Sequence, residues 1–473
     1  MLEINNQYTI LRRQIDTEVL KLFFKGTLEN EVDKLPIQII PKDRNPSRCC
    51  IFKERAMVRY RIMALLGINI EKYDDEYKPL KEYVEEILEK DPDELPVLTT
   101  ISVGCHGCPP EQYRISDACR GCFARPCATN CPKDAIVFIG GQAHIIEEKC
   151  IKCGKCYGVC PYHAVLHLPV PCEEACPVAA VHKNDDGVVE IDHDKCISCG
   201  KCTVSCPFGA IAERSGLMPV AKMLKNNEKT IAMIAPSIEG QFPGTLSQIK
   251  SALLKLGFTK VVEVAKGAEI TSINEAKEVA EKIEKGEGYM TTSCCPAYIG
   301  LINKHLTFLK DIHSTARTPM GYTAELCKKE FPDYKTVFVG PCLAKRVEGA
   351  YTPEVDGVIN FGELAALFLA RDVDVAKEPK ADLGETDSFK DCRNFALTGG
   401  VASCVLCRAH DKDKVRTLSI NGLDKKNVNL MRTWAKRPPE ADLVEVMCCE
   451  GGCIAGPGTI TKPSLAMRLR GKE

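Results

Sequence analysis

The sequence lacks a large net charge of either sign, because 63 Lys and Arg residues nearly balance 64 Asp and Glu residues and leave a net charge of −1. Without an excess of positive charge no long-range field recruits nucleic acid or an anionic membrane surface, and we expect neither as a partner. The sequence also lacks an apolar run long enough for a membrane-spanning helix, and its start, MLEINNQYTILRRQ, lacks the basic and apolar regions of a secretory leader. We therefore expect a cytoplasmic protein.

Cysteine, by contrast, is abundant, with 28 residues in a chain of 473. A reducing compartment disfavours a disulfide framework, and the close spacing of many of these cysteines favours metal ligation. Their density divides the chain into three expected domains: residues 1–96, 97–215 and 228–473. The first domain contains only two cysteines, and stretches such as LKEYVEEILEK predict that it is mostly helical.

In residues 228–473, short β-branched runs alternate with helical patterns. TIAMIAPSI, KVVEVA and KTVFVGP predict buried strands. TLSQIKSALLKLG predicts a helix that buries Leu246, Ile249, Leu253 and Leu256 and ends at Gly257. This alternation indicates an α/β fold with parallel sheets, in which sites lie where strands end.

The middle domain contains the segments CIKCGKCYGVCP (150–161) and CISCGKCTVSCP (196–207). Each is a C-x2-C-x2-C-x3-C-P run, the bacterial ferredoxin signature in which three cysteines hold one 4Fe-4S cluster and the fourth holds its neighbour. Structural zinc is the alternative, but zinc sites usually use two separated pairs and do not need the C-P ending. We therefore expect an α+β ferredoxin-like domain that conducts single electrons.

The other cysteines of this domain extend the pattern. CHGC and CEEACP read as the halves of one ferredoxin motif, separated by the insertion of a second module that also contains CRGCFARPCATNCP. By the exchange rule, we expect four clusters, held by Cys119, Cys122, Cys127 and Cys160; by Cys150, Cys153, Cys156 and Cys131; by Cys196, Cys199, Cys202 and Cys176; and by Cys105, Cys108, Cys172 and Cys206.

Three segments of the last domain share cysteine in Gly-rich or Pro-rich surroundings: TSCCPAY (292–298), GPCLAKRVE (340–348) and EVMCCEGGCIAGPG (445–458). In order and internal spacing they resemble the three signature segments of the FeFe-hydrogenases. The resemblance implies a two-lobed α/β domain with parallel sheets that surrounds the hydrogen-activating H-cluster. It also implies reversible conversion of protons and electrons to dihydrogen, exchange of electrons with ferredoxin or a similar carrier, and maturation enzymes that supply the two-iron subsite.

The resemblance also implies roles for residues of these segments. Cys295, Cys342, Cys449 and Cys453 would bind the 4Fe-4S subcluster, and Cys453 would also bridge to a two-iron subsite that carries carbon monoxide, cyanide and an azadithiolate. Lys345 would hydrogen-bond a cyanide, a favourable use of an ammonium in a dry pocket, and Glu348 would hold Lys345 in place.

Cys294 needs its own explanation, because neighbours on a strand point to opposite faces and Cys295 already faces the iron. Its residue type alone would favour a buried apolar filler. The resemblance implies instead that Cys294 passes protons to and from the bridge amine, which suits a thiol whose reference pKa is about 8.5.

The helix INEAKEVAEKIEKG is expected to supply part of a proton route. Its pattern places Ala276, Val279, Ala280 and Ile283 toward the core. Glu275 and Glu278 lie on another face, where a solvated surface with a Glu278–Lys282 ion pair is the plain alternative. The resemblance favours a relay in which protons pass along Glu278, Ser314, Glu275 and Cys294.

The chain also departs from the common form of the family: Gly340 replaces methionine, Tyr298 tryptophan, and Cys448 alanine, as in a less-studied branch. Two other readings stay open, a non-catalytic iron-sulfur assembly relative and a hydrogen sensor. The retained Cys294 and Lys345 disfavour the first, and the lack of an added signalling domain disfavours the second. For Cys404 and Cys407, a structural role and a redox pair both stay open, and Cys392 is assigned no role.

Overall fold

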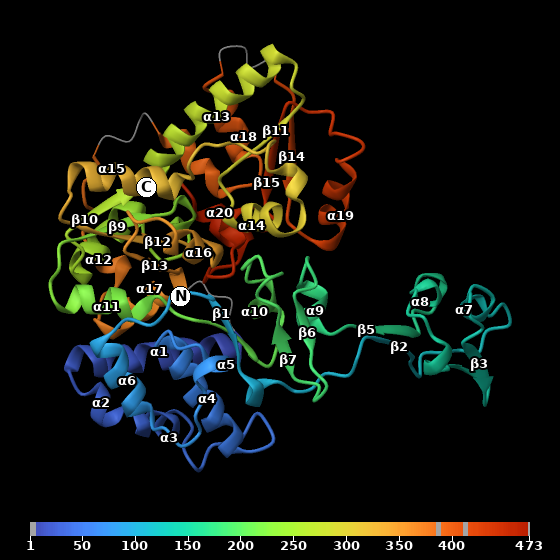
Figure 1. The fold of residues 1–473 in the computed structure, drawn as a ribbon. Helices are drawn as coiled ribbons and strands as arrows, with labels where there is room; N and C mark the ends of the chain where they lie inside the picture. The colour runs from blue at the N-terminus through green and yellow to red at the C-terminus, as the bar shows by residue number, and fades with distance from the viewer. Residues whose placement is uncertain (1–5, 385–388, 410–414, 472–473) are drawn as a thin grey trace.

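The computed structural model describes residues 6–384, 389–409 and 415–471, so the outermost residues of the expected first and last domains (1–5, 472–473) lie outside it. Within these ranges, no helix is both long and apolar enough to cross a membrane. Figure 1 shows two α/β lobes, a layer of helices below them and a slender arm on one side.

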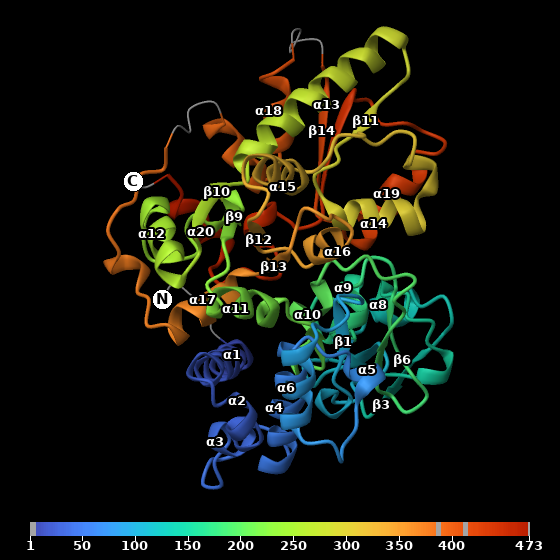
Figure 2. The same cartoon turned by 60° about the vertical axis from the view of Figure 1, so that its left-hand side comes forward.

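The described part of the first 96 residues contains helices and no strand, in agreement with the predicted mostly helical segment. The helices are α1 (Gln7–Lys25), α2 (Leu28–Glu31), α3 (Leu35–Ile39), α4 (Ile51–Leu65), α5 (Ile70–Tyr73) and α6 (Leu80–Glu89). They lie beneath α11 (Leu217–Lys225) and α17 (Phe361–Ala370) (Figure 2). Ile15 and Val19 of α1 belong to the same apolar core as Phe361 and Leu364 of α17. The helical layer is thus packed as a continuation of the neighbouring lobe.

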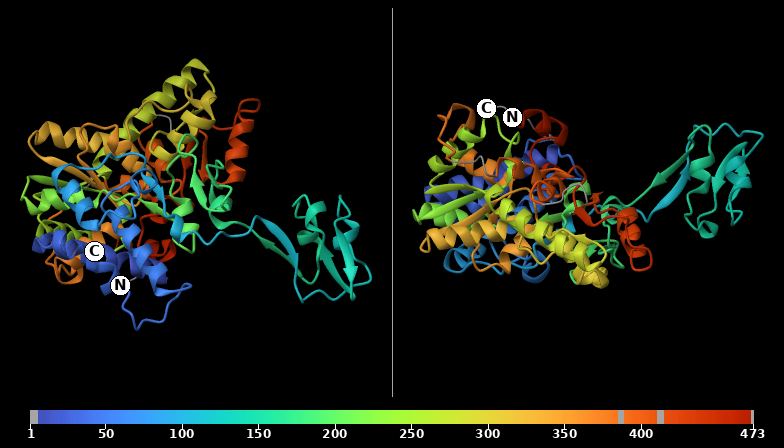
Figure 3. Two further views of the ribbon diagram at one scale, coloured as in Figure 1. Left: turned by 60° about the horizontal axis from the view of Figure 1, so that its bottom comes forward. Right: turned by 90° about the horizontal axis from the view of Figure 1, so that it is seen from above.

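The cysteine-rich domain consists of antiparallel strand pairs and short helices. The pairs are β1 (Leu98–Thr100) with β8 (Ile211–Glu213), β2 (Gln112–Ile115) with β5 (Val165–Leu168), β3 (Ile136–Ile139) with β4 (Gln142–Ile145), and β6 (Val181–Lys183) with β7 (Val189–Ile191). The helices are α7 (Pro126–Thr129), α8 (Lys155–Val159), α9 (Pro171–Ala175) and α10 (Lys201–Ser205). Residues between β2 and β5 form the arm, and the remaining pairs stay against the lobes (Figure 3). The nesting expected from the split motif is therefore visible in the fold.

A local turn recurs four times in this domain, at each Cys-Pro-x-x-Ala segment. The alanine N–H donates to the cysteine Sγ at 3.1 to 3.4 Å, at Cys131, Cys160, Cys176 and Cys206. The residue before each alanine has a positive φ: Asp134, His163, Ala179 and Gly209. The proline fixes the start of the turn and the donated hydrogen bond fixes the sulfur, so the C-P ending orients a ligand.

The last domain contains two fully parallel sheets, as the alternation predicted. One has the order β10-β9-β12-β13, and the other β11-β15-β14. Their strands are β9 (Thr230–Ile234), β10 (Lys260–Glu263), β12 (Lys335–Val339), β13 (Gly357–Ile359), β11 (Met290–Thr291), β14 (Thr417–Asn421) and β15 (Leu443–Met447). The helices not yet named are α12 (Leu246–Leu256), α13 (Ala265–Lys285), α14 (Pro296–His305), α15 (Pro319–Glu330), α16 (Ala344–Ala350), α18 (Gly400–Leu406), α19 (Lys425–Thr433) and α20 (Pro463–Leu469).

Two helices of this domain test the periodicity argument. In α12, Ile249, Leu253 and Leu256 are buried and Gly257 caps the helix at φ 115°, as predicted, whereas Leu246 is only partly buried. In α13 the prediction is partly wrong: Ala276 and Val279 are buried, but Ala280 and Ile283 are exposed. The last turns of α13 extend beyond the lobe (Figure 1), and none of the described residues buries the apolar side chains there.

Candidate active site

Three parallel strands deliver the cysteines of the three signature segments to one place. Cys294 and Cys295 follow β11, Cys342 follows β12, Cys449 follows β15, and Cys453 lies in the next turn. All five line a single cavity. The rest of its wall is almost wholly apolar and includes Ala235, Val264, Pro319, Met320, Phe338, Phe395 and Ala396. The site therefore lies at the carboxyl ends of the strands, as expected for parallel sheets.

The sulfur atoms in this cavity are mutually close and poorly solvated. Burial raises the pKa of Cys295, Cys342 and Cys453, and the neighbouring thiols raise it further. Metal binding takes up such sulfurs as thiolates and releases their protons. Thiolates are soft ligands, and the cavity wall around them is dry and nearly uncharged. Such a site suits an iron-sulfur cluster and does not suit a hard cation, which prefers oxygen ligands. The residues present thus fit the cubane that the sequence predicted.

Lys345 is the cation of this cavity. Its Nζ lies 2.6 Å from Glu348 Oε2 and 3.0 Å from Thr318 Oγ1, and the residue is 8% exposed. The predicted contact between Glu348 and Lys345 is present in the structure. The sequence argument missed Thr318, which also donates to Glu348. It lies 27 residues before Lys345, and no local pattern connects the two.

Glu275 lies next to the half-buried Cys294 of the cavity wall. Glu275 is fully buried, and its Oε1 accepts hydrogen bonds from the backbone N–H of Ser293 at 2.8 Å and from its Oγ at 3.0 Å. Burial raises the pKa of Glu275 to about 7, although these hydrogen bonds and Ser314 partly oppose the rise. Burial likewise raises the pKa of Cys294, and the adjacent Glu275 adds to the effect.

Glu278 continues this group toward the surface. Its carboxylate accepts hydrogen bonds from the backbone N–H of Thr315 at 3.2 Å and from the Thr315 hydroxyl. The described residues contain no Glu278–Lys282 ion pair, so the plain alternative for this face is wrong in that detail. Ser314 and Thr315 also line an open cavity of about 610 Å³. Ser314 interacts with Glu275, and the next residue, Thr315, donates to Glu278, so both carboxyls lie against one segment that also lines the open cavity.

The ferredoxin-like cysteines come together across motifs. Electrostatic interactions connect Cys127 with Cys122 and Cys160, Cys156 with Cys150 and Cys153, Cys172 with Cys206, and Cys202 with Cys196, Cys199 and Cys176. Cys119 and Cys131 pack with the first two groups, and Cys105 and Cys108 pack with the last two. Three of these groups, those of Cys127, Cys172 and Cys202, contain sulfurs from separate sequence segments, the arrangement on which the exchange rule depends.

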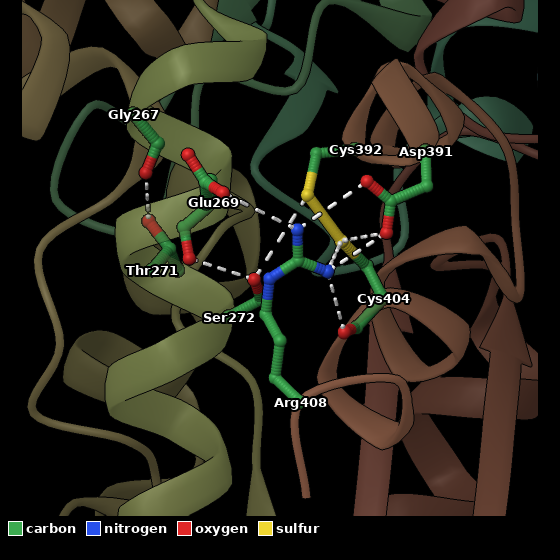
Figure 4. Close-up of a disulfide and its surroundings, with 8 residues drawn as sticks. All are labelled: Gly267, Glu269, Thr271, Ser272, Asp391, Cys392, Cys404 and Arg408. Atoms are coloured by element: carbon green, nitrogen blue, oxygen red, sulfur yellow. Dashed lines mark hydrogen bonds and ion pairs between the residues drawn. A yellow bond between two sulfur atoms is a disulfide. The ribbon is translucent and has the colours of Figure 1, made fainter. Parts of the chain in front are cut away.

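A disulfide joins Cys392 to Cys404, close to the cavity wall (Figure 4). It connects α18 to the 3-10 segment Lys390–Ala396, whose Phe395 and Ala396 line the cavity. Arg408 Nη1 lies 3.2 Å from Cys404 Sγ and 2.8 Å from Asp391 Oδ2. Of the two readings of Cys404 and Cys407, the redox pair is wrong, because Cys404 is bonded to Cys392 and Cys407 is free. The true partner lies 12 residues upstream and gave no spacing signal.

Comparison with known families matches the domain that contains the cavity and the two ferredoxin-type runs. Residues 228–457 match the model "Iron only hydrogenase large subunit, C-terminal domain". Residues 143–166 and 188–211 match models of a 4Fe-4S binding domain. The first match includes every cysteine of the cavity that belongs to the three signature segments, and the other two include the repeated ferredoxin-type runs.

Curated relatives carry hydrogenase names. The chain is 30% identical over 380 residues to the periplasmic Fe hydrogenase large subunit of Nitratidesulfovibrio vulgaris. The alignment covers 68% of this chain and 87% of that protein. It is 27% identical to iron hydrogenase 1 of Clostridium pasteurianum over 69% of this chain and 67% of the relative. It spans about half, 53%, of the NADP-reducing hydrogenase subunit HndD of Solidesulfovibrio fructosivorans, at 27% identity.

Among solved structures, FeFe-hydrogenase HydA1 from Chlamydomonas reinhardtii aligns with 53% of this chain and 87% of its own, at 19% identity and a TM-score of 0.46.

Proposed function

The chain belongs to the iron-only hydrogenase large-subunit family, and we propose that it catalyses the reversible conversion of two protons and two electrons to dihydrogen. The family and the 4Fe-4S matches assign it an H-cluster and additional 4Fe-4S clusters. The observation that supports catalysis best is that Cys294 and Lys345 line the same cavity as the four ligand cysteines. Neither residue is needed to hold a cubane, so both indicate a second, two-iron centre.

In this proposal, Cys295, Cys342, Cys449 and Cys453 would hold the cubane, and Cys453 would also contact the two-iron subsite. The H-cluster, when bound, supplies the iron at which the bond between two hydrogen atoms is made or broken. Lys345 offers its ammonium to an anionic ligand, while Glu348 and Thr318 fix the direction of that ammonium. The apolar wall excludes water and strengthens these interactions.

Protons reach the site through the chain's own side chains. A proton enters near Thr315 at Glu278, passes by way of Ser314 to Glu275, and then reaches the Cys294 sulfur. A carboxyl with a pKa of about 7 can both accept and release a proton near neutral pH, which suits a reversible route. Burial disfavours the Cys294 thiolate, so Cys294 stays protonated until it can pass the proton to a base of the bound cofactor.

Electrons enter at the other end of the molecule. The arm carries Cys153 exposed at its surface, whereas Cys202 and Cys206 of the inner groups are buried against the lobes. We propose that ferredoxin or a similar carrier docks at the arm, and that four 4Fe-4S clusters conduct electrons from there to the cubane. Maturation enzymes for the two-iron subsite and a cytoplasmic location stay predictions from the sequence.

The alternatives make different predictions. A non-catalytic assembly relative would carry the iron-sulfur clusters without a two-iron subsite. A hydrogen sensor would carry the subsite but turn over slowly.

The decisive experiment matures the full chain with its assembly enzymes and records the infrared bands of bound carbon monoxide and cyanide. Their presence, with rapid turnover on reduced ferredoxin or methyl viologen, is the expected result. A chain that contains about 16 or more iron atoms but no such bands would contradict the proposal. Cys342→Ala is the matched control, because it should remove the bands while the arm keeps its clusters.

A further inference from the structure

The helical N-terminal layer contacts the segments that carry two ligand cysteines. Helix α4 packs against β8 and against the 3-10 segment Ser102–Gly104. Cys105 directly follows this 3-10 segment, and the turn that begins at Cys206 leads into β8. The layer therefore lies against one side of the site expected for the cluster of Cys105, Cys108, Cys172 and Cys206.

Arg61 of α4 binds the Cys206 turn directly. Its Nη2 donates to the Gly209 carbonyl, and its guanidinium lies 4.5 Å from the centre of the Tyr8 ring. A Cβ at Gly209 would lie 2.8 Å from this Nη2, whereas the equivalent position in the other three Cys-Pro-x-x-Ala turns carries a side chain at a positive φ. Glycine is therefore needed here for the close approach of the helical layer and not for the turn itself.

Arg48, just before α4, contacts both ligand segments. Its Nη1 donates to the Gly104 carbonyl at 3.4 Å, and its guanidinium lies 4.9 Å from the centre of the Phe208 ring. His106 of the CHGC segment stacks on the same ring at 4.6 Å. Arg48 thus connects the CHGC segment with the turn that holds Phe208.

Neither of these two arginines is neutralised by a carboxylate. Among the described residues, no carboxylate lies within 4.0 Å of either guanidinium, and the buried Arg61 Nε and Arg48 Nη2 have no hydrogen-bond partner. Asp16 attracts Arg61 from a greater distance, but Arg12 lies 3.8 Å from its carboxylate. A buried cation is costly unless an opposite charge compensates it, and Arg61 is only 8% exposed. A 4Fe-4S cluster held by four thiolates is anionic and supplies that opposite charge.

This cluster site lies at the root of the arm. Cys108 precedes β2 and Cys172 follows β5, the two strands through which the chain enters and leaves the arm (Figure 3). In the proposed electron route, an electron from the arm therefore reaches this cluster before it reaches the inner one.

We propose that Arg48 and Arg61 are positioning residues of the helical layer that raise the reduction potential of the cluster held by Cys105, Cys108, Cys172 and Cys206. Reduction adds one electron to this cluster, and no bond or proton is transferred. A nearby positive charge stabilises the more negative, reduced form, and a buried site strengthens the effect. The layer thereby favours electron transfer from the arm into the body of the molecule. The inference rests on the proposed function only in that these cysteines hold a 4Fe-4S cluster.

The test uses the full chain produced without maturation enzymes, so that 4Fe-4S clusters give the only signals. Arg48→Met and Arg61→Met each remove one positive charge, whereas Arg48→Lys and Arg61→Lys retain it. Arg59→Met is the matched control, because Arg59 belongs to the same helix and also donates to a backbone carbonyl, that of Asp75 at 3.1 Å, outside every ligand segment. Midpoint potentials are read by redox titration followed by EPR, together with the iron content. Cys108→Ala identifies the cluster, because its midpoint should be missing from that variant.

Each methionine variant should lower the midpoint potential of this one cluster by about 28 to 59 mV, which is about a three- to tenfold change in the one-electron equilibrium, and leave the other clusters unchanged. The lysine variants and Arg59→Met should keep the potentials of the parent chain. Should Arg61→Met fail to fold, Arg48→Met decides alone, because Arg48 is half-buried and lies outside the helix.

Unchanged potentials in the folded methionine variants would overturn the inference, and so would an equal shift in Arg59→Met. A loss of about four iron atoms from a folded methionine variant would overturn it too, by showing that the arginine retains the cluster and does not set its potential. Failure of the proposed function is separate: the matured chain would then lack carbon monoxide and cyanide bands, whatever the potentials do.

Discussion

Replacing Glu275 with glutamine tests the proton route most directly. The glutamine amide would keep the acceptor that Ser293 contacts and would occupy nearly the same volume, but it cannot release a proton. The fully buried carboxyl has its pKa raised from 4.5 to about 7. At about 1.36 kcal/mol per unit, the buried site disfavours the ionised form by about 3 kcal/mol relative to water.

The sign of the pH effect follows from this raised pKa. Between pH 4.5 and about 7 the native chain holds a proton on Glu275 that the unfolded chain has released. The free energy of unfolding therefore falls as pH rises through this interval and becomes flat above it. For catalysis, the protonated carboxyl needed for hydrogen evolution is lost above pH 7, and the ionised carboxyl needed for hydrogen oxidation is lost below it.

Two measurements follow for Glu275→Gln. Turnover in both directions should fall at least about 100-fold, the usual contribution of a positioned acid or base, while iron content and the infrared bands of the bound site stay intact. In the parent chain, a protonated-carboxyl infrared band should titrate near pH 7 and be missing from the variant. Normal turnover in the variant, or a band that titrates near pH 4.5, would refute the relay.

Three further predictions concern the site and the arm. Lys345→Met should abolish the cyanide bands while cubane iron is retained, since it removes the only cation that the described residues place in the cavity wall. Glu348→Gln should weaken the bands less, and unchanged bands in Glu348→Gln would argue against its role in orienting Lys345. Gly340→Ala should lower the free energy of unfolding by about 1–3 kcal/mol in thermal unfolding, because the new Cβ would lie 2.5 Å from the Phe338 ring. Adding Phe338→Leu should recover this loss, and a double variant that stays as unstable would show that the ring is not the obstacle. Cys153→Ala should remove about four iron atoms and slow turnover driven by ferredoxin while the infrared bands stay; unimpaired turnover would exclude the arm as the entry point.

Local patterns predicted most of the secondary structure and the cysteine groups. The strands around Ile231 and Val337 and the cap at Gly257 were readable because burial and turn chemistry act over a few residues. Cysteine spacing predicted the ligands of the ferredoxin-type runs for a similar reason, since cluster ligation limits how far apart the sulfurs of one run can lie, whereas the cysteines of the catalytic cavity were implied by the resemblance to a family.

Contacts between distant segments could not be read in the same way. Thr318 meets Lys345, and Cys392 meets Cys404, only because separate loops converge in the folded chain. The predicted burial of Ile283 is wrong for a different reason. Ile283 follows the helical periodicity, but no neighbouring element among the described residues covers that end of α13. A sequence pattern shows which face is apolar, whereas tertiary structure decides whether that face is buried.

The strand pair at the base of the arm has a consequence for how this family of chains diversifies. Gln112 of β2 lies opposite Leu168 of β5, so the polypeptide leaves and returns at neighbouring points. Everything beyond that pair could be cut out and the ends rejoined by a short turn, with the remaining polypeptide following its original course. Such an appendage can be gained, lost or exchanged for one suited to a different redox partner, while selection keeps the buried chemistry unchanged.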